Sequence, residues 1–253
     1  MKYLSRYFVI CLLFASAHIH AEEEPSIRVL FVGNSYTYYW NMPLAVTLMA
    51  ESLGKNIYTK QSTEGNTTLE HHWKGEMETQ TKVFIEQGNW DYIVFNNHSL
   101  SPQDIPEKFK EYSLKFADLA KQNGAQPVFY MTWARKHNRL MQPKISKAYR
   151  EIMQESGADL VPIGEIWMKS IDYHPEKNLY AIDDSHPSPL GTYLTALAFT
   201  KYFTGDSVQA VPNQLYINDA NGDKLYIAMM LGENAEFFRD LVDTWNIKNT
   251  KKD

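Results

Sequence analysis

Short apolar runs alternate along this chain with longer amphipathic stretches, and this alternation constrains the fold more than any other feature of the sequence. The apolar runs have the length of strands and the amphipathic stretches have the length of helices, which is the pattern of consecutive βαβ units. Such units build a parallel sheet with helices on both faces, because each crossover packs a helix against the sheet. The sequence therefore predicts an α/β protein with three layers, α/β/α.

Four of the runs are apolar enough to be buried strands, and a fifth is more polar, as expected for a strand nearer the edge of a sheet. The buried strands are predicted at residues 27–32, 91–96, 127–133 and 159–163, and the more polar one at residues 57–62. We therefore expect a central, mostly parallel sheet of five strands.

Helices are predicted between these strands, because amphipathic periodicity coincides there with start and stop signals. Pro43 suits a first helical turn, and a glycine follows each of the first four helical stretches. The predicted helices span residues 43–53, 79–87, 104–123, 144–156 and 188–203, and a short extended piece then precedes one or two terminal helices at 224–245. With no repeat or linker in the sequence, we expect residues 22–253 to form a single domain.

The first 21 residues have the features of a secretory signal peptide. Lys2 and Arg6 precede an apolar run at residues 7–17, and Ala21 offers a cleavage site before an acidic stretch. The run is short for a membrane span, and a retained N-terminal anchor helix is the alternative. The only cysteine, Cys11, lies in this segment. We therefore expect a secreted or periplasmic protein whose processed chain has no membrane span, no disulfide and no cysteine nucleophile.

The charge balance argues against a general binder of nucleic acid. The chain has 25 basic and 30 acidic residues, for a formal net charge of −5. Proteins that bind nucleic acid or anionic membranes through electrostatics carry an excess of basic residues. We therefore expect no nucleic-acid partner.

Ser35 is the first candidate for chemistry. Ligands bind beyond the carboxyl ends of strands in open parallel sheets, and the strand at 27–32 is followed by Gly33, Asn34 and Ser35. Backbone N–H groups at such a strand-to-helix turn favour developing negative charge. Ser35 is therefore a candidate nucleophile, and an ordinary turn residue is the alternative.

His186 is the candidate base for that serine. A serine hydroxyl is a weak nucleophile at neutral pH, and histidine is well matched to accept its proton. Asp183 stands three residues before His186, in the stretch Asp-Asp-Ser-His-Pro. A tight loop would let Asp183 accept from the imidazole Nδ1–H and direct Nε2 outward. This spacing also occurs by chance, and Asp184 is compatible with a helix cap or a solvated turn.

Taken together, these segments resemble the SGNH, or GDSL-type, hydrolases. Residues 32–37 are similar to the first block of that family, with Asn34 where the commoner form has Asp, and residues 183–187 resemble its last block, Asp-x-x-His-Pro. Residues 63–68 are similar to the second block, whose glycine, here Gly65, provides an N–H to the oxyanion hole. The resemblance extends over about residues 27–203.

This resemblance implies the flavodoxin-like fold of the family and a catalytic triad of Ser35, His186 and Asp183. It also implies that the backbone N–H groups of Ser35 and Gly65 hold the tetrahedral oxyanion. The attacking hydroxyl would give its proton to the histidine, which the aspartate orients.

The third block departs from the family pattern of Gly-x-Asn-Asp, in which the Asn side chain donates to the oxyanion. Here the predicted strand is followed by Asn96, Asn97, His98 and Ser99. Alignment on the strand end places Asn96 on the glycine and His98 on the asparagine, and a shift of one residue makes Asn97 the donor. An amide and an imidazole can both donate, so the identity of the third donor stays open at this point.

Other residues near the expected site are candidates for substrate contacts. Trp133 and Arg135 follow the strand at 127–133, although core packing and simple solvation are the alternatives for them. Crowded aromatic residues after Ser35 could stack on a sugar ring or cap the core. The candidate substrate-binding residues are Asn34, Tyr36, Asn96, Trp133 and Arg135, and the aromatic cluster is Tyr36, Tyr38, Tyr39 and Trp40.

A metal site is not expected at the adjacent histidines, His71 and His72. Neighbouring side chains point about 100° apart on a helix, and no second ligand recurs one turn later. We expect these histidines to border the pocket and expect the protein to need no cofactor or metal.

The sequence as a whole predicts an exported serine esterase for acyl esters, with acetyl groups on a carbohydrate as the expected substrate, given the aromatic loop and the resemblance to carbohydrate-deacetylating members of the family. The expected partner is a small-molecule or glycan ester. The alternatives are a lipase, thioesterase or arylesterase of the same family, and a catalytically silent glycan-binding protein with the same fold. A dinucleotide-binding protein lacks support because residues 33–35 lack the further glycines of G-x-G-x-x-G. An α/β-hydrolase lacks support because G-x-S-x-G is absent from the sequence.

Overall fold

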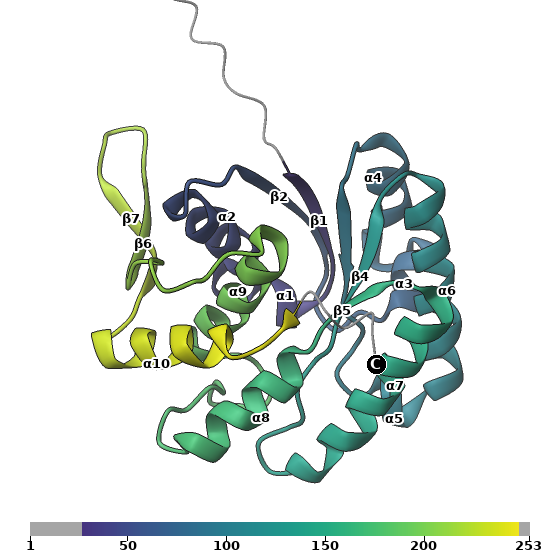
Figure 1. Cartoon of the computed structure of the whole chain (residues 1–253). Coiled ribbons are helices and arrows are strands. Elements are labelled where there is room, and N and C mark those ends of the chain that lie inside the picture. Colours follow the sequence, from purple (N-terminus) through teal and green to yellow (C-terminus); the bar gives the residue numbers. More distant parts are fainter. Residues whose placement is uncertain (1–26, 248–253) are drawn as a thin grey trace, which may run out of the picture.

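A parallel sheet of five strands forms the centre of the computed structural model, which describes residues 27–247 (Figure 1). The strand order is β2-β1-β3-β4-β5, and each neighbouring pair is parallel. The strands are β1 (Ile27–Gly33), β2 (Ile57–Thr63), β3 (Tyr92–Phe95), β4 (Gln126–Tyr130) and β5 (Asp159–Val161). The predicted sheet is confirmed, including the edge position of its more polar strand, β2.

Helices cover both faces of this sheet, which gives the predicted three layers (Figure 1). One face is covered by α2 (Met42–Ser52), α8 (Ile163–Tyr173), α9 (Pro189–Thr204) and α10 (Gly232–Asp243). The other is covered by α3 (Leu69–Lys74), α4 (Thr81–Gln87), α6 (Pro106–Gln122) and α7 (Gln142–Ser156). Short elements in the connections are α1 (Ser35–Tyr38), η1 (Tyr39–Asn41), η2 (Glu76–Glu78), α5 (Ser101–Asp104) and η3 (Arg139–Met141).

The side chains of β1 belong to two hydrophobic cores, one on each face of the sheet. Val29 and Phe31 pack with the layer that contains α9, whereas Leu30 and Val32 pack with the layer that contains α6. Successive side chains of a strand point to opposite faces, so a central strand must be apolar throughout. This requirement explains the continuous apolar run and holds the carboxyl end of β1 rigidly between the helix layers.

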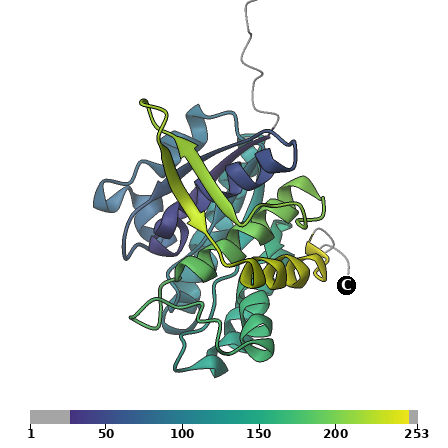
Figure 2. The same cartoon turned by 90° about the vertical axis from the view of Figure 1, so that its left-hand side faces the viewer.

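A helix is missing from the prediction, and a predicted one is partly wrong. The missing helix is α8 (Ile163–Tyr173), which begins almost directly after β5. The strand predicted at 159–163 is therefore too long, because β5 ends before Pro162 and Ile163 is the first residue of α8. Residues 224–229 are not helical but form β7 (Lys224–Met229), which pairs antiparallel with β6 (Gln214–Asn218). Only the later part of the predicted terminal helix forms, as α10. Figure 2 shows the resulting hairpin crossing over α2 on the outside of the molecule.

None of the helices within residues 27–247 combines the length and the apolar character that a membrane span requires. The signal peptide predicted at residues 1–21 lies outside the described residues.

Candidate active site

Ser35 lies where β1 ends and α1 begins, at the carboxyl edge of the sheet. The preceding residue, Asn34, caps the short helix, because its Oδ1 accepts a hydrogen bond of 3.1 Å from the backbone N–H of Tyr36. The sharp change from strand to helix directs the Ser35 side chain out of the sheet and into a pocket.

The backbone around Ser35 is fixed by Asn34 and Asn96. Asn34 donates from Nδ2 to the carbonyl of Thr67 at 3.0 Å and from its backbone N–H to Asn96 Oδ1 at 3.3 Å. Asn96 in turn donates to Asn34 Oδ1 at 3.1 Å. This approach requires glycine at position 33, since a Cβ there would lie 1.6 Å from Asn96 Oδ1. Ser35 is therefore held in place jointly by the ends of β1 and β3 and by the loop after β2.

His186 reaches Ser35 from the tight loop that precedes α9. Its Nε2 lies 2.7 Å from Ser35 Oγ, although 151 positions separate the two residues in the chain. The loop is closed by a hydrogen bond of 2.8 Å from the Ala181 N–H to the His186 carbonyl. Within the loop, Asp184 takes a left-handed conformation with φ of 56°, which Asp tolerates better than most residues.

Asp183 holds the other side of the imidazole. Its Oδ2 accepts a hydrogen bond from His186 Nδ1, and its Oδ1 accepts from the backbone N–H groups of Ser185 at 3.1 Å and His186 at 2.9 Å. Burial raises the pKa of Asp183, but these hydrogen bonds outweigh it and lower the pKa to about 2. The carboxylate is therefore ionised at neutral pH and favours the tautomer with the proton on Nδ1, which leaves Nε2 able to accept from Ser35.

These three side chains line a pocket of about 230 Å³. Asn66, Ser99 and Ser185 also line the pocket and were not predicted as site residues. Its full lining is Asn34, Ser35, Tyr36, Asn66, His98, Ser99, Arg135, Asp183, Ser185 and His186.

Two of the predicted oxyanion donors, Gly65 and Asn97, already form hydrogen bonds within the protein. The Gly65 N–H donates to Glu64 Oε1 at 2.8 Å, so this exposed carboxylate must move before the N–H can bind an oxyanion. Asn97 is 2% exposed, and its Oδ1 accepts from the backbone N–H groups of Leu69 at 3.1 Å and His98 at 2.9 Å. Asn97 thus braces the loop after β3 and does not line the pocket.

His98 is the member of the third block that lines the pocket. Its Nδ1 accepts a hydrogen bond of 3.3 Å from the Leu100 N–H, which places the proton of the neutral ring on Nε2. Burial lowers the pKa of His98, and the positive charge of Arg135 lowers it further. His98 therefore presents a neutral N–H donor, which is the property that an oxyanion hole needs.

Comparison with known proteins finds other structures with the same fold. No family model matches the sequence, and no curated protein matches it. Solved structures do match. A protein assigned as an SGNH hydrolase from Slackia heliotrinireducens is 28% identical with a TM-score of 0.59, and the match covers 69% of this chain and 97% of that one. A DUF4886 family protein from Bacteroides uniformis has a TM-score of 0.69 at 16% identity, with 86% and 93% covered. The chain has the fold of the SGNH hydrolases.

An acetyl xylan esterase is also similar in fold, with a TM-score of 0.56 at 13% identity, and the match covers 68% of this chain and 98% of that one. Solved structures of the superfamily thus match this chain over most of their own length. The resemblance first seen in the sequence blocks is confirmed at the level of the fold.

Two candidate substrate residues are placed differently from the prediction. Trp133 is 0% exposed and lies stacked between Tyr36 and Trp167, with ring centroids 4.5 Å and 3.7 Å away. Its indole N–H donates to the Ser185 carbonyl at 2.9 Å, so it supports the histidine loop from the core. Asn96 is 1% exposed and its side chain is committed to the frame around Ser35. Neither of them lines the pocket, and the prediction that they contact substrate there is wrong.

The aromatic cluster after Ser35 holds His186 in place. The Tyr39 ring lies stacked on the His186 imidazole, with centroids 4.4 Å apart. Tyr36 donates or accepts a hydrogen bond of 2.7 Å with Ser185 Oγ, and the Trp40 indole N–H donates to the Pro187 carbonyl at 3.0 Å. Both sides of the histidine loop are therefore held by residues that directly follow Ser35.

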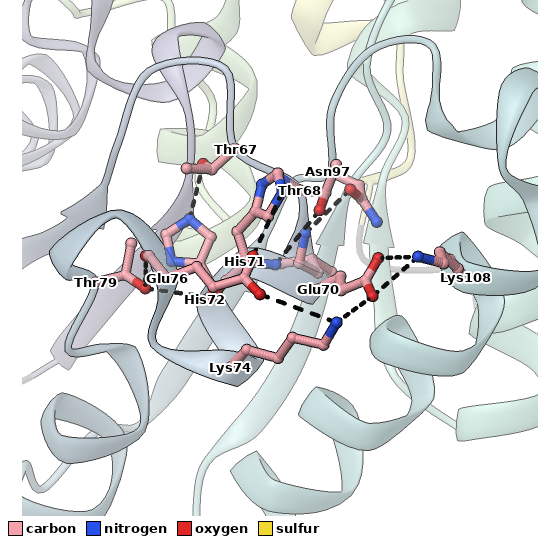
Figure 3. A network of polar contacts seen from close by, with 11 residues as sticks. Thr67, Thr68, Glu70, His71, His72, Lys74, Glu76, Thr79, Asn97 and Lys108 are labelled. Atoms are coloured by element: carbon pink, nitrogen blue, oxygen red, sulfur yellow. Dashed lines mark hydrogen bonds and ion pairs between the residues drawn. The ribbon is translucent and has the colours of Figure 1, made fainter.

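His71 and His72 lie on α3 behind the site, in the network of Figure 3. His72 is buried, and its Nε2 donates to the Gly33 carbonyl at 2.9 Å while its Nδ1 accepts from Thr81 Oγ1 at 2.6 Å. Burial lowers the pKa of His72 to about 4, although the bond to Gly33 opposes this. His71 instead closes the start of α3 by accepting from the Thr68 N–H. Within residues 27–247, no group of three or more His, Cys, Asp or Glu side chains is arranged to hold a metal ion.

Proposed function

We propose that this protein is a serine hydrolase that cleaves carboxylic esters through an acyl-enzyme. The observation that carries the proposal is the contact of 2.7 Å between Ser35 Oγ and His186 Nε2, with Asp183 bonded to the opposite nitrogen of the same ring. A serine, a base and a residue that orients the base are the parts that nucleophilic acyl transfer requires. The SGNH fold supports the same reaction class.

In the first half of the reaction, Ser35 Oγ attacks the ester carbonyl while His186 Nε2 takes the hydroxyl proton. The tetrahedral intermediate collapses, and the leaving alcohol departs with the proton that His186 returns. In the second half, water attacks the acyl-enzyme, His186 takes a proton from this water, and Ser35 recovers it when the acid leaves. Asp183 stabilises the imidazolium formed in each half.

The proposed oxyanion donors are the backbone N–H groups of Ser35 and Gly65 and the Nε2–H of His98. The orientation of the His98 ring supports its role, because Nδ1 is occupied by the Leu100 N–H. Gly65 joins the set once the Glu64 carboxylate moves away from its N–H. Each such donor typically contributes about 10²- to 10³-fold in rate.

We propose an acetyl ester of a carbohydrate as the substrate. A catalytic pocket of about 230 Å³ suits a small acyl group. Trp40 lies at the histidine loop with 52% of its surface exposed and offers a face on which a sugar ring can stack. The likeness to an acetyl xylan esterase is consistent with this substrate class.

The test compares the wild type with Ser35→Ala, Asp183→Asn and the control Ser52→Ala on para-nitrophenyl acetate and on acetylated xylan. Ser52 is an exposed serine at the end of α2, and its hydroxyl donates to the Met49 carbonyl and not to a residue of the triad. We expect Ser35→Ala to abolish turnover, Asp183→Asn to lower kcat by about 10⁴-fold, and Ser52→Ala to match the wild type. Equal rates for wild type and Ser35→Ala would contradict the mechanism. Binding of xylan without turnover would favour the silent glycan-binding alternative.

We also propose that residues 1–21 direct export to the periplasm or the medium. The support is the sequence pattern of a basic start, an apolar run and a small residue at position 21. Expression of the full chain in a bacterial host, followed by N-terminal sequencing of the periplasmic protein, should give a chain that begins at Glu22. Retention of the full-length chain in the membrane fraction would support the anchor-helix alternative.

A further inference from the structure

Arg135 brings a positive charge into the catalytic pocket that the triad mechanism does not use. It follows β4 at the carboxyl edge of the sheet and lines the same pocket as Ser35 and His186. Charged side chains are rarely placed against a reaction pocket without a partner, since burial of an unpaired charge is costly. Its surroundings therefore indicate what the pocket is built to receive.

Most N–H donors of the Arg135 guanidinium have no hydrogen-bond acceptor in the described part of the chain. Within residues 27–247 its one hydrogen bond runs from Nη2 to Ser99 Oγ at 3.2 Å, and its Nε is buried without an acceptor. A guanidinium carries five N–H donors. By contrast, Arg239, whose Nε is likewise buried, donates to the Val211 carbonyl at 3.0 Å and to Asn213 Oδ1 at 2.7 Å.

The described part of the chain also gives Arg135 no carboxylate, whereas Arg150 pairs with Glu165 at 2.7 Å and Arg139 pairs with Asp172. The acidic groups of the histidine loop are already engaged. Asp183 is bonded to His186, and Asp184 pairs with Lys136 at 3.3 Å. The positive charge of Arg135 is thus left uncompensated at the pocket.

The neighbours of Arg135 are neutral hydrogen-bonding groups. Burial lowers the pKa of His98, and burial raises the pKa of Tyr36, so both are uncharged at neutral pH. The hydroxyls of Ser99 and Ser185 complete this side of the pocket. An anion bound on this side of the pocket would contact the Arg135 guanidinium and several neutral hydrogen-bond donors, and it would face no carboxylate there.

We propose that Arg135 forms an anion subsite of the catalytic pocket and that the ester substrate carries a carboxylate bound there. The inference rests on the proposed esterase function and specifies its substrate class. A single guanidinium matches one negative charge, and its planar fork fits the two oxygens of a carboxylate. Because Arg135 and Ser35 share one pocket of about 230 Å³, the carboxylate must lie close to the scissile ester in the same molecule.

The test uses pairs of esters in which one member carries a carboxylate and the other carries a neutral group at the same position. para-Acetoxybenzoate and para-acetoxybenzamide place the charge on the alcohol side, whereas mono(para-nitrophenyl) succinate and para-nitrophenyl butyrate place it on the acyl side. The quantity measured is the ratio of kcat/KM for the anionic ester to kcat/KM for its neutral partner. Wild type is compared with Arg135→Gln, Arg135→Lys and Arg139→Gln, which removes a guanidinium from the same connection but outside the pocket.

We expect Arg135→Gln to lower this ratio by at least about tenfold in one of the two pairs, as for the loss of a charge-assisted hydrogen bond. Arg135→Lys should restore part of it, and Arg139→Gln should leave it unchanged. The pair that responds identifies the side of the ester that carries the carboxylate. A ratio that Arg135→Gln leaves unchanged in both pairs would overturn the inference, because a purely structural arginine affects both esters alike. If the wild type cleaves neutral esters without preferring either anionic one, only the inference fails, and if it cleaves none of the four, the proposed function fails.

Discussion

The phenol ring of Tyr39 lies parallel to the imidazole of His186, with ring centroids 4.4 Å apart and an angle of 12° between the planes. Tyr39 stands four positions after Ser35, whereas His186 comes from a distant part of the chain. The stacking therefore ties His186 to the segment that carries Ser35. It restrains the imidazole on its face, while Asp183 restrains it at its edge.

Replacement of Tyr39 tests this restraint. We expect Tyr39→Ala to lower kcat/KM for para-nitrophenyl acetate by about two- to tenfold, the range that aromatic pairs contribute. Tyr39→Phe keeps the ring and should stay close to the wild type. If Tyr39→Phe loses as much as Tyr39→Ala, the hydroxyl and not the stacking is responsible.

The identity of the third oxyanion donor is tested at His98. We expect His98→Ala to lower kcat by about 10²-fold with little change in KM, because the donor acts mainly on the transition state. His98→Gln retains an N–H donor and should recover part of the rate. Should Asn97→Asp abolish turnover in a stably folded protein while His98→Ala is fully active, the oxyanion donor is the asparagine instead.

Buried His72 predicts a pH dependence of stability. In the unfolded chain its pKa is near 6.5, whereas burial lowers the pKa in the folded protein to about 4. Below pH 6.5 the unfolded state thus binds the extra proton first, so stability is fully present above pH 6.5 and is lost as the pH falls towards 4. The loss is about 3 kcal/mol. The free energy of unfolding, measured with urea, should fall between pH 7 and pH 4 by about 3 kcal/mol less in His72→Gln than in the wild type. An equal fall in both proteins would show that His72 is not the group responsible.

The close approach of Gly33 and Asn96 predicts that mutations at these two positions affect stability non-additively. Gly33→Ala places a Cβ 1.6 Å from Asn96 Oδ1, so we expect a loss of about 1–3 kcal/mol in the free energy of unfolding. Asn96→Gly removes the obstacle but also several hydrogen bonds. The double variant should therefore be more stable than the sum of the single losses indicates, by about 0.5 kcal/mol or more. Strict additivity in urea unfolding would show that the two residues do not meet.

The parts of the site that could be predicted depend on local sequence. Ser35 follows a strand whose buried character is evident from its apolar run, and Asp183 and His186 share one loop. The direction in which Trp133 points depends on distant contacts. A position after a strand specifies the edge of the sheet, but Trp133 turns into the core because Trp167 of α8 stacks on it, and α8 was not predicted.

The β6–β7 hairpin shows the same limit in the fold. The apolar residues of 224–229 are compatible with a helix or a strand when they are considered alone. Pairing with β6 decides between the two, and this pairing is a contact between segments. The turn between them contains Gly222 with φ of 88°, a conformation that favours glycine. An Asn-Gly pair is a local turn signal, whereas the pairing of two strands depends on contacts between separate segments.

Fluorophosphonate labelling tests the central claim most directly, because the reagent modifies serines that a neighbouring base activates. Mass spectrometry of the labelled and digested wild type should locate one adduct, on Ser35, and Ser35→Ala should remain unlabelled under the same conditions while Ser52→Ala labels normally. An unlabelled but folded wild type, or an adduct on another serine that persists in Ser35→Ala, would contradict the assignment of Ser35 as the nucleophile.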